Sequence, residues 1–360
     1  MENQHRRIKI LYTIPNFDTA GSGKVLYDLA KGLNKENFEV IIACSNNKGL
    51  FFKEVEKLGL PIFIRSITKP LKPYYTLLFR LKENIKFIRT NKIDIVHSWH
   101  WSSDWTEVLT ARLGGAKFVY TKKAMTWGNI HWEIKSYLSS FIITINEEMK
   151  NYFPNKKTQK LIPLGLDLNY YNPELFPKKE DETIFKIITV ANLVPVKGIE
   201  VLIKAMGLLN NNIYLEILGD DRAAYASELK KMVLDLNLQN QITFLGKHND
   251  VRPFLVNADL YVIPSLKEGM PMALVEAMSM AIPVVGSNIS GINYVLAAFP
   301  ELLFEPNNEK QLAERIVAIY NKSEVDKQQL GTNLRNYCVA HFSYEKFIAA
   351  HEELYTKLVQ

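Results

Sequence analysis

Apolar runs of strand length recur along the chain and alternate with stretches of helical periodicity. The first run, at residues 8–14, leads into a glycine-containing segment and then into apolar residues at helical spacing, from Val25 to Leu33. This order of strand, helix and strand is typical of a βαβ unit with a parallel sheet. The pattern therefore predicts a doubly wound α/β domain. Its further strands are expected at residues 38–43, 62–64, 93–97, 117–121, 141–145 and 160–163.

The alternation stops between residues 169 and 182 and then restarts. The interrupting stretch is rich in tyrosine, proline and charge, which indicates a linker. A length of 360 residues also fits two domains. We expect one Rossmann-like domain over residues 1–168 and a second from residue 169, with the ligand between the carboxyl ends of the two sheets. The later strands are expected at residues 185–190, 213–218, 241–245, 260–263, 282–285 and 302–304.

Composition narrows the class of protein. No apolar run reaches the roughly 18 residues of a membrane span, and the polar N-terminus predicts no signal peptide. Cys44 and Cys338 do not make a disulfide framework, and no Cys/His cluster has the spacing of a zinc site. These features predict a cytoplasmic enzyme.

Charge is distributed unevenly between the two halves. Residues 1–165 carry 26 Lys and Arg against 14 Asp and Glu, a net +12, so the remaining residues carry −6 of the total +6. A basic first half favours an anionic partner surface. It would also permit a nucleic-acid-binding protein, but no recognised nucleic-acid motif accompanies the charge, and we expect no nucleic-acid partner.

Two glutamates, Glu268 and Glu276, stand eight residues apart in a segment that predicts strand, loop, helix and strand. Glu268 falls in a loop with Gly269 and Pro271, and Glu276 is expected about two turns into a helix over 272–280. Backbone N–H groups and the helix dipole at such a loop favour an anion. Two carboxylates would be repelled by that anion unless they bind hydroxyls, which suggests a ligand with phosphate and sugar. Taken alone, the pair also fits two ordinary solvated glutamates.

This segment resembles the E-x7-E signature of retaining glycosyltransferases of family 4, which have the two-domain GT-B fold. Further segments resemble the family in the same order, so the resemblance spans nearly the whole chain. They are residues 20–26, which resemble the family's N-terminal glycine loop, and residues 94–97, 162–167, 190–198, 218–220 and 244–246. The resemblance implies two Rossmann-like domains facing a cleft, with a donor domain over 169–343 and a final helix at 344–360 that returns to the first domain.

The implied reaction moves a sugar from a nucleotide-diphosphate sugar to a hydroxyl of a glycan or lipid-linked acceptor in cell-surface polysaccharide synthesis. A UDP-sugar is the expected donor from family frequency. The transferred group is expected to be a hexosyl or N-acetylhexosaminyl unit, with retention and with no metal or other cofactor. A nucleotide-sugar epimerase or a phosphorylase would keep the fold, although the E-x7-E element argues against both. A non-catalytic basic binding protein is the alternative from another class.

The resemblance also assigns roles to single residues. Lys197 would stabilise the leaving diphosphate, Glu268 would position the transferred sugar and Glu276 would bind the ribose. We favour a front-face transfer in which the leaving phosphate takes the acceptor proton. Donor contacts are also expected from Gly21, Ser22, Asn192, Gly219, Gly269, Met270, Met272, Ala273, Leu274 and Val275.

The chain departs from the family pattern near the diphosphate. Asn192 stands where an Arg is common, so we expect Lys122 or Lys123 to supply the missing charge; a surface role is the simpler alternative. The string Gly21-Ser-Gly-Lys24 is not a P-loop, because Val25 replaces the Ser or Thr that would hold magnesium.

Acceptor contacts are expected from His97, Trp99 and Asp104, which follow one strand of the first sheet, although a core role is the better interpretation for any single Trp. Residues 65–92 carry eight Lys and Arg against the single acid Glu83. Their apolar positions have helical spacing. The segment is either an ordinary amphipathic helix on the sheet or a surface that rests on anionic lipid, which would make the enzyme peripheral on the inner face of a membrane.

Overall fold

The computed structural model describes residues 6–360 apart from 18–19, 50, 178–183 and 223. The chain divides into two compact units, Met1–Gly165 together with Tyr344–Gln360, and Leu166–Ser343. The sequence placed the boundary after residue 168. Of the expected linker at 169–182, residues 178–182 lie outside the described residues.

The N-terminal unit is built on a seven-stranded parallel sheet of order β3-β2-β1-β4-β5-β6-β7. The strand order reverses between β1 and β4, which pair from Ile10 with Ile95 to Thr13 with Ser98. The predicted strands are confirmed, with small shifts at their ends. They are β1 (Ile8–Ile14), β2 (Phe38–Cys44), β3 (Ile62–Ile64), β4 (Ile95–Ser98), β5 (Lys117–Lys122), β6 (Phe141–Thr144) and β7 (Gln159–Leu161).

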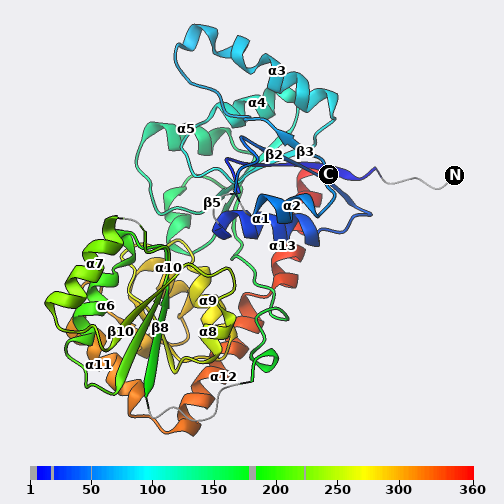
Figure 1. Cartoon of the computed structure of the whole chain (residues 1–360). Helices are drawn as coiled ribbons and strands as arrows, with labels where there is room; N and C mark the ends of the chain where they lie inside the picture. The colour runs from blue at the N-terminus through cyan, green and yellow to red at the C-terminus, as the bar shows by residue number, and fades with distance from the viewer. Residues whose placement is uncertain (1–5, 18–19, 50, 178–183, 223) are drawn as a thin grey trace. The chain divides into compact units, whose positions relative to one another are not determined.

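Helices cover both faces of this sheet (Figure 1). One face carries α1 (Ala20–Gly32), α2 (Phe52–Glu56) and α13 (Tyr344–Val359). The other carries α3 (Leu77–Thr90), α4 (Thr106–Gly114) and α5 (Ile130–Leu138). Two 3₁₀ turns, η1 (Tyr74–Thr76) and η2 (Glu148–Tyr152), complete the unit.

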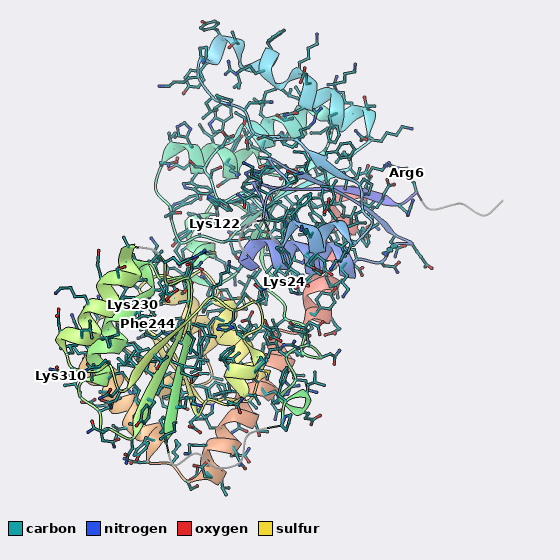
Figure 2. All side chains as sticks on the ribbon, in the orientation of Figure 1. Arg6, Lys24, Lys122, Lys230, Phe244 and Lys310 are labelled. Carbon is teal, nitrogen blue, oxygen red and sulfur yellow. The ribbon has the colours of Figure 1, made fainter. Side chains whose placement is uncertain are left out.

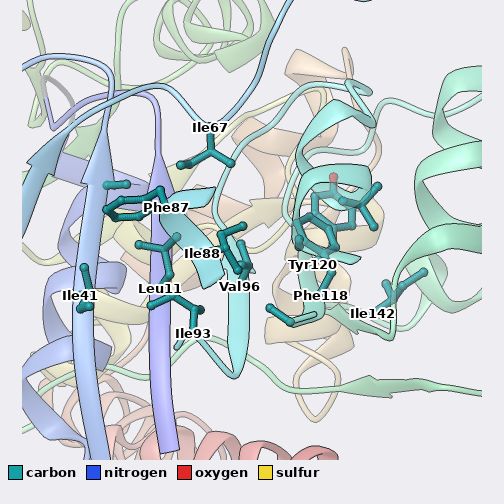
Figure 3. Close-up of a cluster of buried hydrophobic side chains, with 14 of the residues drawn as sticks. Leu11, Ile41, Ile67, Phe87, Ile88, Ile93, Val96, Phe118, Tyr120 and Ile142 are labelled. Atoms are coloured by element: carbon teal, nitrogen blue, oxygen red, sulfur yellow. The ribbon is translucent and has the colours of Figure 1, made fainter. Parts of the chain in front are cut away.

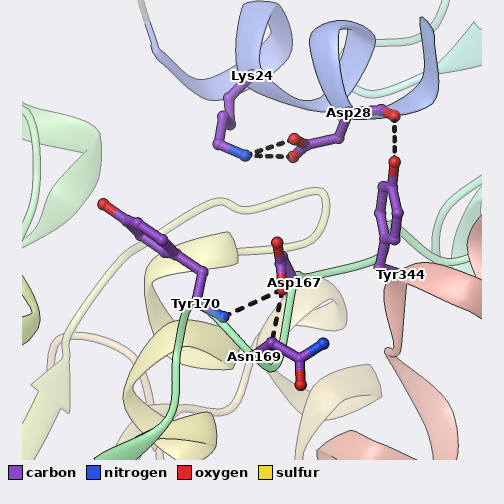
Figure 4. Close-up of polar contacts among 6 residues, drawn as sticks. All are labelled: Lys24, Asp28, Asp167, Asn169, Tyr170 and Tyr344. Carbon is purple, nitrogen blue, oxygen red and sulfur yellow. Dashed lines mark hydrogen bonds and ion pairs between the residues drawn. The ribbon is translucent and has the colours of Figure 1, made fainter. Parts of the chain in front are cut away.

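The final helix, α13, packs closely within the N-terminal unit. A Cβ on Gly32 of α1 would overlap the Tyr344 hydroxyl and the Ile348 side chain, so glycine is what allows the two helices to approach. The Tyr344 hydroxyl donates to the Asp28 carbonyl at 2.9 Å (Figure 4). Further along α13, the hydroxyl of the fully buried Tyr355 lies 3.2 Å from that of Tyr12 on β1.

The predicted glycine loop at residues 20–26 is wrong, because α1 already begins at Ala20 and places Gly21 in its first turn. Glycine here serves packing: a Cβ on Gly23 would lie 3.1 Å from the ring of Phe17. The short strand-to-helix connection therefore ends before the glycines.

The core of the N-terminal unit lies between the sheet and the helices α3 and α4. It is formed by Leu11, Val96, Phe118 and Ile142 from the strands and by Ile88 from α3, all fully buried (Figure 3). Strands covered on both faces read as continuous apolar runs, which is why the sequence pattern located them.

The C-terminal unit has a six-stranded parallel sheet of order β10-β9-β8-β11-β12-β13. Its predicted strands are also confirmed. They are β8 (Phe185–Val190), β9 (Ile213–Leu218), β10 (Ile242–Gly246), β11 (Leu260–Ile263), β12 (Val284–Ser287) and β13 (Leu303–Phe304). The order reverses between β8 and β11, where Tyr261 pairs with Ile188.

Helices flank this second sheet as well (Figure 1). One face carries α6 (Ile199–Met206), α7 (Ala224–Asp235) and α11 (Glu309–Tyr320), and the other carries α9 (Met272–Ser279) and α12 (Glu324–His341). Shorter elements are α8 (Arg252–Val256), α10 (Ser290–Val295), η3 (Pro173–Leu175), η4 (Pro195–Lys197) and η5 (Pro300–Leu302). In the described part of the chain, every helix is too short or too polar to cross a bilayer.

Candidate functional site

Two loops leave the C-terminal sheet where its strand order reverses. One follows β8 and contains η4, and the other joins β11 to α9. Doubly wound sheets bind their ligands at this edge. The loops are tied together, because the Leu266 amide donates to the Val196 carbonyl at 2.8 Å. Gly198 has a φ of 62°, and a Cβ there would overlap the Pro264 carbonyl oxygen, so only glycine permits this approach.

Lys197 and Glu268 form an ion pair between these two loops. The Lys197 ammonium donates to Oε1 of Glu268 at 2.6 Å, and the Ser265 hydroxyl donates to the same oxygen at 2.9 Å. The two charged side chains are only 24% and 13% exposed. Both residues were predicted for the donor site from the sequence, and the structure brings them together. Ser265 was not predicted. Its hydroxyl orients the Glu268 carboxylate, but its position along the sequence does not indicate this role.

The Glu268 loop packs against α10 and β12. A Cβ on Gly291 would overlap the Glu268 carbonyl oxygen, and the Ser287 hydroxyl donates to the Ser265 carbonyl. A loop fixed in this way keeps its carboxylate in one position, which is what preorganised binding of sugar hydroxyls requires.

Glu276 lies in the second turn of α9, which begins at Met272 after the extended residue Pro271, as the sequence predicts. The phenol of Tyr171 hydrogen-bonds to Glu276, and burial together with this carboxylate raises the pKa of Tyr171 above its usual value. The carboxylate expected to bind ribose is thus already held by a hydroxyl. From the sequence, Tyr171 was expected only as part of the linker.

Polar contacts hold the tyrosine segment in place. The Asp167 carboxylate accepts from the backbone amides of Asn169 and Tyr170 (Figure 4). The guanidinium of Arg252 lies 3.4 Å from the centre of the Tyr170 ring, and Arg335 donates to the Tyr171 carbonyl at 2.8 Å. Tyr171 is therefore a fixed neighbour of Glu276.

The remaining expected donor contacts of the C-terminal unit lie around the same edge. Gly269, Met272 and Ala273 are half-buried and Met270 is buried, while Asn192 is exposed on the β8 loop. The amides of Leu274 and Val275 donate to the Pro271 carbonyl, at 3.1 and 3.3 Å. The amides of Met272 and Ala273 precede the first helical hydrogen bonds and are the better placed to bind an anion. Gly219 packs against the β8 loop, because a Cβ there would overlap the Ala191 carbonyl.

The N-terminal unit has its own reversal of strand order, between β1 and β4. Glu107 on α4 is fully buried there and accepts from Ser98 of β4 at 2.6 Å and from Thr13 of β1. One carboxylate thus joins two strands and a helix beneath this edge. Glu107 was not predicted. The only feature of the sequence that could have indicated it is an acidic residue on an otherwise buried face of α4.

His97 and Trp99, expected to contact the acceptor, lie in the interior of the N-terminal unit. Both are fully buried, and the His97 ring nitrogens lie 2.6 Å from the Tyr355 hydroxyl and 2.7 Å from that of Thr121. Their burial fits a role in the protein core, and a contact with the acceptor stays a prediction. Asp104 is half-buried, and its carboxylate accepts from the amide of Thr106, the first residue of α4, at 2.7 Å.

The two lysines expected to supply extra charge also point inward. The Lys122 ammonium lies 3.9 Å from the centre of the Trp132 ring and donates to the Thr126 carbonyl. Figure 2 labels Lys122 among the side chains of the N-terminal unit. The Lys123 ammonium donates to the Trp99 carbonyl at 2.6 Å, and burial lowers its pKa to about 7. A surface role is therefore wrong for Lys122, which is fully buried. Contact of either lysine with the diphosphate stays a prediction.

Gly21 and Ser22, expected in a donor-binding loop, occupy the first turn of α1. Gly21 is exposed and Ser22 half-buried, and a Cβ on Gly21 would meet nothing within 4 Å. Among the described residues, no group of three or more His, Cys, Asp and Glu is arranged to hold a metal ion.

Comparison with known proteins decides the family. A family model described as Glycosyl transferases group 1 matches residues 172–337, and one described as Glycosyltransferase Family 4 matches residues 19–170. The chain belongs to glycosyltransferase family 4. The loop pair of the C-terminal unit and the buried network of the N-terminal unit are thus parts of a glycosyltransferase.

Full-length relatives are distant in sequence. This family 4 glycosyltransferase is 25% identical to an Escherichia coli protein named UDP-Gal:alpha-D-GlcNAc-diphosphoundecaprenol alpha-1,3-galactosyltransferase, over 100% of this chain and 99% of that protein. It is 20% identical to a Campylobacter jejuni N,N'-diacetylbacillosaminyl-diphospho-undecaprenol alpha-1,3-N-acetylgalactosaminyltransferase, over 92% and 94% of the two chains.

Solved structures show the same fold. A Rickettsia africae glycosyltransferase matches with a TM-score of 0.86 at 20% identity, over 98% of this chain and 99% of that one. Anabaena HepE, solved with UDP and glucose, matches with a TM-score of 0.81 at 18% identity, over 97% and 100%. The family 4 glycosyltransferase accordingly has the GT-B architecture of two Rossmann-like units.

Proposed function

We propose that this glycosyltransferase transfers a sugar, with retention, from a nucleotide-diphosphate sugar to a hydroxyl of a lipid-linked or glycan acceptor in surface polysaccharide synthesis. The observation that carries the proposal is the Lys197–Glu268 pair at the strand-order reversal of the C-terminal sheet. The names of the E. coli and C. jejuni relatives, both of which act on undecaprenol-linked diphosphates, support a lipid-linked acceptor. UDP is the favoured nucleotide.

In the proposed reaction the bond between the anomeric carbon and the diphosphate oxygen breaks, and a bond to the acceptor oxygen forms on the same face. Lys197 offsets the charge that develops on the leaving diphosphate. The departing phosphate oxygen takes the acceptor proton, so no protein base is required. Glu268 accepts hydrogen bonds from the sugar hydroxyls and Glu276 from the ribose. This scheme uses protein charge and needs no metal.

Thermal-shift titration with UDP, GDP and ADP tests the donor, because a ligand that binds the folded state raises its melting temperature. We expect UDP to give the largest shift. The sugars of the stabilising nucleotide are then offered with an undecaprenyl-diphosphate-linked sugar, and products are followed by mass spectrometry with and without EDTA. No transfer with any donor that binds would contradict the proposal.

Product analysis without acceptor separates the alternatives. A nucleotide-sugar epimerase would release an epimerised sugar in the absence of acceptor. A non-catalytic binding protein would bind the nucleotide and leave the sugar unchanged. Transfer that requires acceptor and preserves the anomeric configuration identifies the retaining transferase.

A further inference from the structure

The start of α3 exposes a cluster of large apolar side chains. Tyr75 is 89% exposed, Phe79 78%, Leu78 65% and Tyr74 55%. They lie within six consecutive positions, over η1 and the first turn of α3. Single exposed apolar residues are ordinary on soluble proteins, but a contiguous group marks a surface that binds something.

Packing of α3 on its own unit does not explain this cluster. Leu77, Leu81 and Ile88 form the inward face of the helix and are buried. Leu78 and Phe79 point the other way, so the amphipathic pattern is satisfied without them. The sequence left an ordinary amphipathic helix and a lipid-binding surface open as alternatives, and the structure shows that the first accounts for the inner face only.

The loop before the cluster is fixed. The Arg80 guanidinium donates to the carbonyls of Pro70 and Pro73, at 2.7 and 3.1 Å. These contacts close the turn that leads into η1. Tyr74 and Tyr75 are thereby presented on a defined turn.

Basic side chains continue the same outward surface. Lys72, Lys82 and Lys86 are exposed, and in the described part of the chain no acidic group pairs with any of them. Arg89 follows on the same face, and its guanidinium reaches the Leu113 carbonyl. Glu83 is the single acid in residues 65–92 against eight Lys and Arg. The surface therefore combines apolar side chains at one end with uncompensated positive charge along its length.

We propose that this α3 surface, formed by Tyr74, Tyr75, Leu78 and Phe79 with Lys72, Lys82 and Lys86, docks onto an anionic lipid bilayer. Aromatic rings with a polar edge favour the boundary between headgroups and acyl chains, and lysines beside them contact lipid phosphates. Charge complementarity selects this occupant over a neutral partner. The consequence rests on the proposed function: docking holds the enzyme in the layer to which a lipid-linked acceptor is confined.

Vesicle co-sedimentation of the full chain tests the proposal. We expect binding to vesicles of phosphatidylglycerol and phosphatidylcholine, little binding to phosphatidylcholine alone, and weakening by salt. The Tyr75→Ser/Phe79→Ser variant should lose most of the binding. The Lys82→Glu/Lys86→Glu variant should bind at least about tenfold more weakly, since each lysine near an anionic surface contributes roughly fivefold.

Matched controls use equally exposed side chains elsewhere. Tyr137→Ser removes an 82% exposed ring from α5, and Lys322→Glu reverses an exposed lysine of the C-terminal unit. Both should bind vesicles as the unchanged chain does. An unchanged thermal shift with nucleotide shows that each variant remains folded.

Equal binding to neutral and anionic vesicles, or full binding by both double variants, would overturn the proposal. So would a dimer in lipid-free solution that dissociates on Phe79→Ser, because the surface would then join two copies of the chain. Transfer to a soluble acceptor analogue is expected to be unaffected by either double variant. Failed transfer with intact vesicle binding would reject the enzymatic proposal alone.

Discussion

The contact between Lys197 and Glu268 places opposite charges at the edge where a diphosphate sugar is expected to bind. Because Glu268 is proposed to bind the transferred sugar and Glu276 the ribose, the two glutamates should behave differently on substitution. Glu268→Ala should mainly lower kcat, and Glu276→Ala should mainly weaken donor binding. Steady-state kinetics with the identified donor measures both.

Glu301→Ala provides the control, since this exposed glutamate lies in η5. Its kinetics should match those of the unchanged enzyme. Normal kcat for Glu268→Ala together with normal donor affinity for Glu276→Ala would reject the assignment of both carboxylates.

Tyr171 supplies a second prediction at this scale. Its phenol occupies the Glu276 carboxylate that ribose hydroxyls are expected to use. Tyr171→Phe removes that donor and keeps the ring, so we expect tighter nucleotide binding, by about tenfold for a hydrogen bond to a charged group. Isothermal titration with UDP measures the change.

Tyr170→Phe is the matched control, because its ring keeps the stack on Arg252. In a Glu276→Ala background, Tyr171→Phe should have no further effect on nucleotide affinity. Weaker binding by Tyr171→Phe would instead mean that the phenol helps Glu276 to hold the ribose.

Single residues show where sequence reasoning stops. Glu268, Glu276 and Lys197 were predicted because they sit in recognisable segments around a strand-order reversal. Ser265 and Tyr171 were missed because their importance comes only from the carboxylates they contact. His97 and Trp99 were expected to contact the acceptor, since a strand end predicts proximity to a ligand edge but not the direction of a side chain, and both are buried.

At the scale of elements, the approach of η4 to β11 depends on Gly198. Gly198→Ala would adopt a left-handed conformation that costs about 1–2 kcal/mol, and its Cβ would also displace the Pro264 carbonyl. We expect the free energy of unfolding to fall by more than about 2 kcal/mol and nucleotide affinity to fall with it, because Lys197 moves. Urea unfolding and thermal shifts measure the two effects.

The variant Gly246→Ala separates the cost of the left-handed backbone conformation from the cost of the steric contact. Gly246 also has a positive φ, 73°, but a Cβ there would meet only the Asp221 carboxylate at an ordinary 3.7 Å. This variant should show the conformational cost alone and bind nucleotide normally. Equal loss in the two variants would show that the contact with Pro264 contributes nothing.

Most strands were predictable because burial on both faces produces continuous apolar runs, and the thirteen strands of the described chain overlap predicted segments. The edge strands β3 and β7 are not buried in this way. The start of α1 was not predicted correctly, because Gly21 and Gly23 have low helix propensity and indicated a loop. The packing of Gly23 against Phe17 overrides that propensity.

At the scale of the whole molecule, buried histidines predict acid sensitivity. Burial lowers the pKa of His351 to about 4 and that of His97 well below its ordinary value, and the neighbouring His351 and Lys123 charges lower it further for His97. Between about pH 4 and the unfolded value near 6.5, the unfolded chain binds more protons than the folded one. The contribution of these histidines to stability is therefore constant above that range and falls as the pH drops through it, by about 1.4 kcal/mol per pH unit for His351 alone.

The free energy of unfolding of the N-terminal unit, measured by urea unfolding at pH 7 and at pH 5, gives this slope. His248→Gln is the control, since His248 is exposed, and it should leave the slope unchanged. His351→Phe should flatten the slope. A free energy of unfolding that is equal at the two pH values would contradict the prediction.

The helix α13 belongs to the N-terminal unit although the whole of the C-terminal unit precedes it along the chain. During translation, β1 and α1 therefore leave the ribosome long before the helix that covers them. Until Tyr355 arrives, Tyr12 and His97 lack the partner that completes their buried network. The N-terminal unit is thus synthesised first and completed last, so a premature stop codon directly before residue 344 would remove α13 from the N-terminal unit and leave the segment of the C-terminal unit intact.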